Sequence, residues 1–468
     1  MTDSILFWNG VALEANRVSH TDGSKEQNGP TLSSRALAIV HLAMYDAYIA
    51  VAKPAGLAPY LLGLPTPPPG ASAPAAVAGA AHKTLSTLYP SQRALFDQKL
   101  AEANVSEDPG LPFGRQVGVA LLEDRAGDPG AGDEGYTPSN ARGRHREDPD
   151  NPGQRFHGPF YGARVKGFAI TARHELEAPP RDKHDYLRAL RDVRRLGIAP
   201  ELMGTIPASV APRTVDQTLV GLFWAYDGAA EIGTPPRLYN QIVARVAVAR
   251  RNTEAQNARL FALVNAAMAD AGTLSWDQKY KHDLWRPVLG IREHASSMGP
   301  GASQPSNDIS DDADLGWLPL GAPATNSVGK KNLTPPFPAY PSGHATFGAA
   351  AFHSTRLFYG VPFGDRNPDK LFDGLSFVSD ELNGASRDNR GAVRPRHLRN
   401  FPGGLWQMIL ENGLSRVYLG VHWSFDAFLL GENGRPELSK NIGGVPLGLT
   451  IAEDIFRSGL KKSAVGPR

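Results

Sequence analysis

The chain has 468 residues, enough for two or three domains with substantial cores. Its 49 Lys+Arg and 47 Asp+Glu nearly cancel, so no global field directs it to nucleic acid or to an anionic membrane, and tight binding of an anion must come from local placement of charge. Cysteine is absent, which excludes disulfides, thiolate metal sites and a cysteine nucleophile. That absence has two open interpretations: chance or a cytoplasmic origin, and tolerance of strong oxidants.

Membrane and export signals are not evident in the sequence. No stretch approaches the roughly eighteen consecutive apolar residues of a membrane span, and the alanine-rich run 71–81 is too short. Met1-Thr2-Asp3-Ser4 has neither a basic n-region nor an apolar h-region. We therefore expect no contact with membranes and no secretion signal, hence a cytoplasmic protein unless a non-standard route exports it.

Apolar residues recur at helical spacing along most of the chain. The predicted helices cover residues 35–51, 75–88, 115–122, 214–226, 238–249, 345–359 and 405–419. A capping-box pattern at Thr253–Gln256 opens a segment towards Ala269, and a second helical stretch follows Gly272 and ends near Arg292. After residue 419 we expect a looser tail.

Sequence runs typical of β-strands are nearly missing. We therefore predict an all-α fold of two packed four-helix bundles, with an N-terminal bundle in residues 1–210 and a C-terminal bundle carrying the site in 211–468. Long loops rich in Gly and Pro cover residues 61–74, 127–162 and 297–341. Loops of this length are usually functional or disordered, and the third should form the wall or lid of a site.

Lys279 and Arg286 lie seven residues apart, so on one helix they would share a face about 10.5 Å apart along the axis. Two such cations can converge on one oxyanion. The alternative is a solvated basic face. Pro287, directly after Arg286, indicates a kink or a helix end.

The segment Pro341-Ser342-Gly343-His344 precedes a helical pattern. A Ser-Gly step at a helix start offers free backbone N–H groups, a hydroxyl and the positive end of the helix dipole to an anion. Glycine also lets the backbone approach closely. A simple capped helix with a partly exposed His344 is the alternative.

Arg416 and His422 are six residues apart and out of phase on a continuous helix, so they reach one ligand only if the helix ends near Gly420. Asp426 follows His422 by four residues, the spacing at which a carboxylate can hold an imidazole N–H and fix its tautomer. A satisfied core histidine is the alternative. Together, the three segments suggest a site for a phosphate-shaped dianion.

The three segments read Lys-x6-Arg-Pro, Pro-Ser-Gly-His and Ser-Arg-x5-His-x3-Asp in this order, and this set resembles the vanadium-dependent haloperoxidases and the acid phosphatases related to them. Residues Phe223–Asp227, Phe337–His344 and Gly420–Trp423 are similar to the chloroperoxidase branch. The resemblance implies the two-bundle fold and one vanadate per chain, bound at the end of the second bundle.

The resemblance also implies roles for individual residues. Vanadate would be held by Lys279, Arg286, Ser342, Gly343, Arg416 and His422, with His422 as the direct ligand to vanadium. His344 would be the acid–base residue, and Lys279 would also take part in catalysis by polarising bound peroxide.

Further side chains would surround this set. Phe337 and Trp276 would line the halide side, and Phe337, where bromoperoxidases commonly have histidine, favours chloride competence. Asp227 would orient a histidine, pair with Arg416, or simply lie at the surface or cap a helix. Asp426 competes for the orienting role.

The implied activity is oxidation of halide (chloride and/or bromide) by hydrogen peroxide to hypohalous acid, which halogenates a small organic acceptor. The alternatives are an acid phosphatase, with His422 as the nucleophile and His344 protonating the leaving group, and a non-catalytic oxyanion binder. An apolar side formed by Trp276 and Phe337 favours the haloperoxidase. The sequence leaves the oligomeric state open, a homo-oligomer included.

Overall fold

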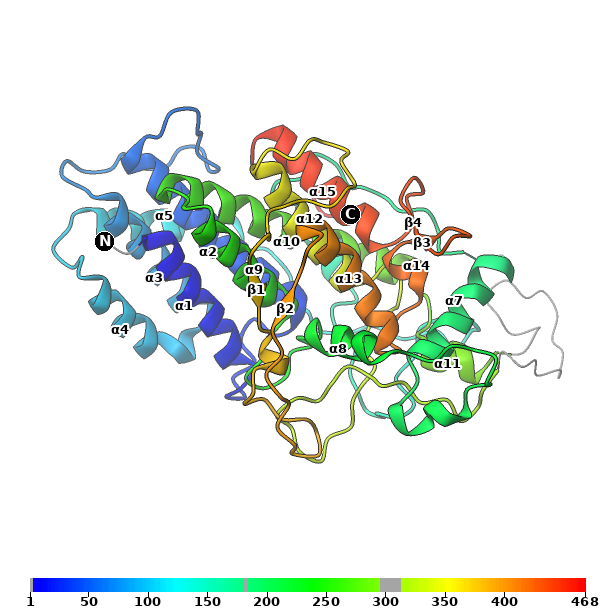
Figure 1. Ribbon diagram of the computed structural model, residues 1–468. Coiled ribbons are helices and arrows are strands. Elements are labelled where there is room, and N and C mark those ends of the chain that lie inside the picture. Colours follow the sequence, from blue (N-terminus) through cyan, green and yellow to red (C-terminus); the bar gives the residue numbers. More distant parts are fainter. Residues whose placement is uncertain (1–2, 181–182, 295–312) are drawn as a thin grey trace.

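A computed structural model describes residues 3–180, 183–294 and 313–468 (Figure 1). The helices of the first half are α1 (Ser4–Ser19), α2 (Gly29–Ala52), α3 (Ala73–Leu88), η1 (Pro90–Gln92), α4 (Arg93–Ala103), α5 (Gly110–Asp124), α6 (Tyr161–Arg164), α7 (Lys183–Leu196) and η2 (Pro200–Thr205). Those of the second half are α8 (Val215–Phe223), α9 (Pro235–Ala249), α10 (Glu254–His282), α11 (Pro287–Arg292), α12 (Gly343–Phe358), η3 (Asp380–Leu382), α13 (Gly404–Tyr418), α14 (Ser424–Ala427) and α15 (Gly444–Ser458).

Strands are short and few in the described ranges. β1 (Ser376–Phe377) pairs with β2 (Arg399–Asn400), and β3 (Leu429–Leu430) pairs with β4 (Pro436–Glu437), both antiparallel. The predicted all-α class is confirmed.

The first bundle is built around α2, which packs against α3, α5 and α10. Glycines let α3 and α5 approach closely: a Cβ at Gly114 would come within 1.9 Å of the Ala76 carbonyl oxygen, and one at Gly79 within 2.2 Å of the Leu111 oxygen. By length and hydropathy α2 could span a membrane, contrary to the sequence expectation, but 72% of its most apolar window is buried inside the protein. That burial is typical of a core helix.

The second bundle has α12 at its centre, packed against α10, α13 and α15. The predicted loose tail after residue 419 is therefore wrong, because α15 forms the most extensive helix pair of this half. In the sequence, the Gly and Pro residues of α15 resemble helix breakers. They instead permit close packing, since a Cβ at Gly448 would lie 2.4 Å from the Thr346 carbonyl oxygen.

Helix α10 connects the two bundles, because it packs against α2 on one side and α12 on the other (Figure 1). The capping box at Thr253 and Gln256 is present as predicted. The predicted break at Gly272 is wrong: the helix continues, and Gly272 lies at a close contact where a Cβ would be 3.2 Å from the Phe347 ring. The boundary at residue 210 stays a prediction.

Candidate active site

The predicted segments converge on one cavity of about 280 Å³ between the bundles. The sequence-predicted residues that line it are Asp227, Trp276, Phe337, Gly343, His344, Arg416 and His422. Lys279, Arg286, Ser342 and Asp426 are buried close to it and hydrogen-bond to the lining residues or their loops.

The Ser-Gly-His segment begins a helix, as predicted. Ser342 is the N-cap of α12, and its hydroxyl accepts a hydrogen bond from the Ala345 N–H at 3.4 Å. Gly343 lines the cavity and packs on Trp276, where a Cβ would lie 3.2 Å from the indole ring. The first N–H groups of a helix lack intrahelical partners, so this end of α12 can bind an anion.

Lys279 and Arg286 do not share one helix face, so that prediction is wrong. α10 ends at His282, Asp283 adopts a left-handed conformation (φ 52°), and Arg286 is the N-cap of α11. Both cations nevertheless lie next to the Phe337 ring. Burial and the charge of Arg286 lower the pKa of Lys279 well below its usual value.

Three backbone carbonyls of the loop before Ser342 surround the Lys279 ammonium. Nζ donates to the oxygens of Pro338 at 2.9 Å, Ala339 at 3.1 Å and Pro341. A lysine has three N–H donors, so this set uses all of them. In this structure Lys279 therefore fixes the loop and supplies positive potential from behind the cavity.

Arg286 is held by backbone groups but keeps one free donor. Its Nε donates to the Phe337 oxygen at 2.8 Å, and its Nη1 donates to the Val421 oxygen at 2.8 Å and contacts His422 Nε2 at 2.9 Å. Its buried Nη2 has no hydrogen-bond partner among the described residues. Burial lowers the pKa of Arg286 to about 9.

Arg416 lies in the last turn of α13, which ends at Tyr418. Gly420 then turns the chain (φ 74°), as predicted, and leaves no room for a side chain, because a Cβ would meet the Gly197 oxygen at 2.4 Å. Arg416 donates two hydrogen bonds to Asp227, at 2.7 and 2.9 Å. Its buried Nε finds no partner in the described part of the chain.

The His422 ring has a defined tautomer. Arg286 can only donate, so His422 Nε2 must accept and Nδ1 must carry the proton. Nδ1 lies 2.8 Å from Asp426 Oδ2, which also accepts the Trp423 N–H at 3.0 Å. Burial raises the pKa of Asp426 to about 7. The carboxylate thus fixes the imidazole with a lone pair on Nε2.

His344 is held by a backbone carbonyl: its Nε2 lies 2.6 Å from the Ala225 oxygen. The carbonyl can only accept, so Nε2 donates and a neutral ring keeps its lone pair on Nδ1. Burial, with the charge of Arg416, lowers the pKa of His344 to about 3. The imidazole is therefore neutral over the physiological range.

The opposite side of the cavity is apolar. The Trp276 and Phe337 rings lie 4.7 Å apart, and Lys279 Nζ and Arg286 Cζ lie 5.1 and 4.9 Å from the Phe337 centroid. Pro335 and Pro336 extend this surface, so the loop before Pro341 forms a wall, as expected. Residues 295–312 of that loop lie outside the described residues.

His157 is a lining residue that the sequence did not indicate. Its ring lies 5.8 Å from the Trp276 ring and 6.2 Å from the Phe337 ring, and its Nε2 is 2.9 Å from Thr31 Oγ1. Its carbonyl accepts the Trp276 indole N–H at 3.1 Å. Burial lowers the pKa of His157 to about 4. An isolated histidine in a long loop carries no spacing signal that could have revealed it.

The first bundle also contributes to the cavity through residues 28–30 at the start of α2. No motif marks them. A Cβ at Gly29 would collide with the His157 ring at 2.5 Å, and Gly29 has a left-handed backbone (φ 73°). The wall therefore depends on a contact between residues distant in sequence.

The polar side fits a tetrahedral oxyanion. It has two buried guanidinium donors without partners in the described ranges, on Arg286 and Arg416, together with a helix N-terminus and the Nε2 lone pair of His422. Burial and the neighbouring cations also lower the pKa of His422 well below its usual value. A bound anion would relieve this repulsion. Fold and site together define a helical oxyanion-binding protein.

Comparisons with known proteins narrow this class. Residues 259–443 match the family model of the VCPO second helical-bundle domain, and residues 1–157 match that of the vanadium chloroperoxidase N-terminal domain. The chain is 37% identical to the vanadium chloroperoxidase of Curvularia inaequalis, over 98% of this chain and 90% of that protein. The chain therefore belongs to the vanadium chloroperoxidase family.

Solved structures show the same fold. A bacterial vanadium-dependent iodoperoxidase aligns with a TM-score of 0.65 at 17% identity, covering 96% of this chain and 95% of its own. The apo-type bacterial vanadium-dependent chloroperoxidase aligns with a TM-score of 0.62 at 16% identity, covering 92% and 95%.

Proposed function

We propose that this protein is a vanadium-dependent haloperoxidase that oxidises halide, chloride and/or bromide, with hydrogen peroxide to hypohalous acid, which then halogenates a small organic acceptor. One observation carries the proposal: two buried guanidinium donors, on Arg286 and Arg416, lack partners within the described residues beside the lone pair of His422. Family membership supports it independently.

The residues suited to hold vanadate are those of the polar side. His422 would bind vanadium through Nε2, which requires Arg286 Nη1 to release that nitrogen. Arg286 and Arg416 would bind the vanadate oxygens through their free donors. The Gly343 amide and the Ser342 hydroxyl would add contacts at the start of α12. Bound vanadate would supply Lewis-acid activation of hydrogen peroxide at a constant oxidation state.

Proton transfer falls to His344. Its Nε2 is committed to the Ala225 carbonyl, so Nδ1 is the atom that can take a proton from hydrogen peroxide. Because burial lowers the pKa of His344 to about 3, the imidazole is in its base form at neutral pH.

Lys279 acts here through its charge. Its donors lie on three carbonyls, so it holds the loop that carries Phe337 and adds positive potential to the cavity. A direct hydrogen bond from Lys279 to bound peroxide would require it to release one carbonyl, and this role stays a prediction.

The apolar wall suits a halide, which is weakly hydrated and polarisable. Trp276, Phe337 and His157 offer ring surface, and Lys279 and Arg286 beside Phe337 can offset part of the hydration that a halide loses on binding. A phosphate ester would not need such a surface. This difference favours halide oxidation over phosphatase chemistry on the same polar residues.

The test is a pair of assays on one preparation. Vanadate-reconstituted protein with peroxide should halogenate a phenol or dimedone-type acceptor when bromide or chloride is present. The vanadate-free protein is assayed with p-nitrophenyl phosphate. Phosphate release without halogenation would support the phosphatase, and vanadate binding with neither activity would support an oxyanion binder.

A further inference from the structure

Three consecutive residues hold two of the groups that surround the cavity. The Ala225 carbonyl accepts the hydrogen bond of His344 Nε2 at 2.6 Å, and the Asp227 carboxylate accepts two hydrogen bonds from Arg416 at 2.7 and 2.9 Å. The position of the 225–227 backbone therefore sets the orientation of the acid–base imidazole and of an oxyanion-binding guanidinium at the same time.

The residue between these two contacts has an unusual backbone. Tyr226 is left-handed, with φ 43°, although it is bulky and not glycine. Such a conformation is disfavoured and persists only when the surroundings determine it. Tyr226 is fully buried, so the groups packed around its side chain can hold its backbone in this conformation.

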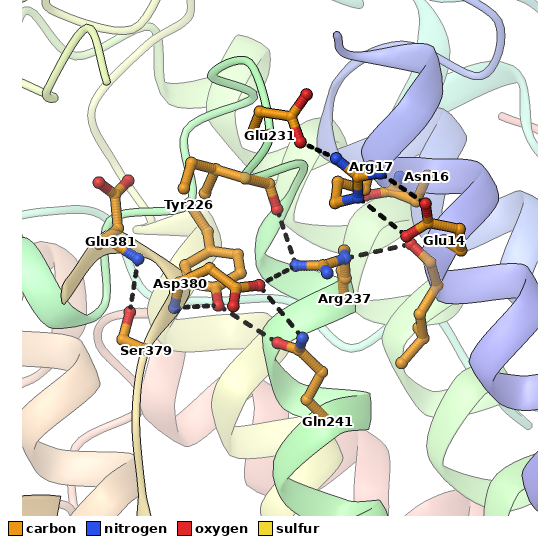
Figure 2. Close-up of polar contacts among 12 residues, drawn as sticks. Glu14, Asn16, Arg17, Tyr226, Glu231, Arg237, Gln241, Ser379, Asp380 and Glu381 are labelled. Atoms are coloured by element: carbon orange, nitrogen blue, oxygen red, sulfur yellow. Dashed lines mark hydrogen bonds and ion pairs between the residues drawn. The ribbon is translucent and has the colours of Figure 1, made fainter. Parts of the chain in front are cut away.

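A polar network clamps the Tyr226 hydroxyl (Figure 2). The hydroxyl accepts the Asp380 N–H at 2.9 Å and donates to Gln241 Oε1 at 3.2 Å. Gln241 Nε2 in turn donates to Asp380 Oδ2 at 3.2 Å. The three groups form a closed ring of hydrogen bonds, which fixes the hydroxyl in both its donor and acceptor directions.

The network is anchored in turn to the first bundle. Arg237, at the start of α9, forms an ion pair with Asp380 and donates through Nε to the Leu13 oxygen of α1 at 3.1 Å. It also donates to the Ile232 oxygen at 3.1 Å, in the turn that follows Asp227. Figure 2 shows Asp380 lying between Arg237 and the Tyr226–Gln241 pair.

We propose that Tyr226 is a positioning residue: its hydroxyl, held by Asp380 and Gln241, fixes residues 225–227 so that His344 and Arg416 are aligned together on the bound oxyanion. The inference rests on the proposed function, and it assigns a positioning role to a residue at the cavity wall whose hydroxyl is bound to Asp380 and Gln241. It also gives the left-handed backbone of Tyr226 a role in the site.

The direct test is Tyr226→Phe, which removes only the hydroxyl. We expect kcat at saturating vanadate and the affinity for vanadate each to fall about tenfold, since a buried hydrogen-bonded ring is opened, while the KM for bromide changes less than about twofold. Tyr45→Phe is the matched control, because its hydroxyl bonds to the Ala58 oxygen at 2.9 Å within the first bundle. It should retain wild-type kinetics.

The outcomes separate this inference from the function itself. If wild-type protein shows no halide oxidation, the proposed function fails. If wild-type protein is active and Tyr226→Phe differs from it only in melting temperature, Tyr226 is structural and the inference is overturned. Should Tyr226→Phe not fold, Gln241→Met removes the acceptor of the hydroxyl. It should lower kcat in the same direction by about threefold, and wild-type kinetics would overturn the inference.

Discussion

The two sides of the cavity are built in different ways. The cationic side, formed by Arg286, Arg416 and His422, is held by directed hydrogen bonds to carbonyls and carboxylates in the second half of the chain. The apolar side, formed by Trp276, Phe337 and His157, is held mainly by ring packing between Trp276 of α10 and loop residues of both halves. We infer that the first side determines retention of the oxyanion and the second determines the halide.

The largest expected effect is on the cationic side. His422→Ala removes the atom proposed to bind vanadium, and its loss should weaken vanadate retention by at least about 100-fold. Vanadium content after dialysis measures this. His344→Ala is the control, because it should keep the ion but lose turnover. Equal vanadium loss in both variants would contradict this division of roles.

Asp426→Asn tests the support of the cationic side. Without the carboxylate, the His422 tautomer is no longer fixed, so vanadate affinity should fall about tenfold to 100-fold. The vanadate-free protein provides a second measurement. Burial raises the pKa of Asp426 from 3.8 to about 7, so the folded protein holds this proton longer than the unfolded chain.

The raised pKa of Asp426 makes the stability of the fold depend on pH. Stability from this group is fully present below about pH 4 and is lost as pH rises to about 7. The Asn variant lacks this loss of stability, so its melting temperature should rise relative to that of wild type as pH increases from about 4 to about 7. A parallel pH dependence of the two melting temperatures would contradict the assignment.

Phe337→Ala tests the apolar side. Removing the ring should raise the KM for halide about tenfold, since apolar surface and two cation–π contacts are lost. Vanadate retention should change less than about threefold, because the hydrogen bond from Arg286 is accepted by the Phe337 carbonyl, which alanine keeps. Phe363→Ala, at an exposed phenylalanine, is the control. Comparable loss of vanadate and halide binding would erase the distinction between the two sides.

The smallest effect is expected for His157→Phe. Because burial lowers the pKa of His157 to about 4, the ring is neutral at pH 6 and both proteins should have the same halide KM there. As pH falls to about 4, wild-type His157 gains charge, and its KM should drop about two- to fivefold relative to the variant. The halide KM of both proteins is measured at pH 6 and at pH 4. A ratio of the two KM values that does not change with pH would contradict the prediction.

The cationic side could be predicted because short motifs carry it. Ser342-Gly343 at a helix start, the turn at Gly420 and the i, i+4 pair of His422 and Asp426 are local patterns with local geometry. The Lys279–Arg286 pair shows the limit of this reasoning. Both residues reach the site, but through a helix end at Asp283 rather than along one face.

The apolar side was only partly predictable. Trp276 and Phe337 stand next to motif residues, whereas His157 reaches the cavity through a long loop whose path depends on tertiary contacts. The same limit explains the errors in the fold. Gly272 and the glycines of α15 look like helix breakers in isolation, yet each allows a neighbouring element to approach.

Helix α10 has a mechanical consequence. It packs against helices of both bundles, and Trp276 and Lys279 lie in its C-terminal part. Because one continuous helix belongs to both bundles, we expect it to resist their separation. We therefore expect turnover to survive immobilisation of the protein on a solid support.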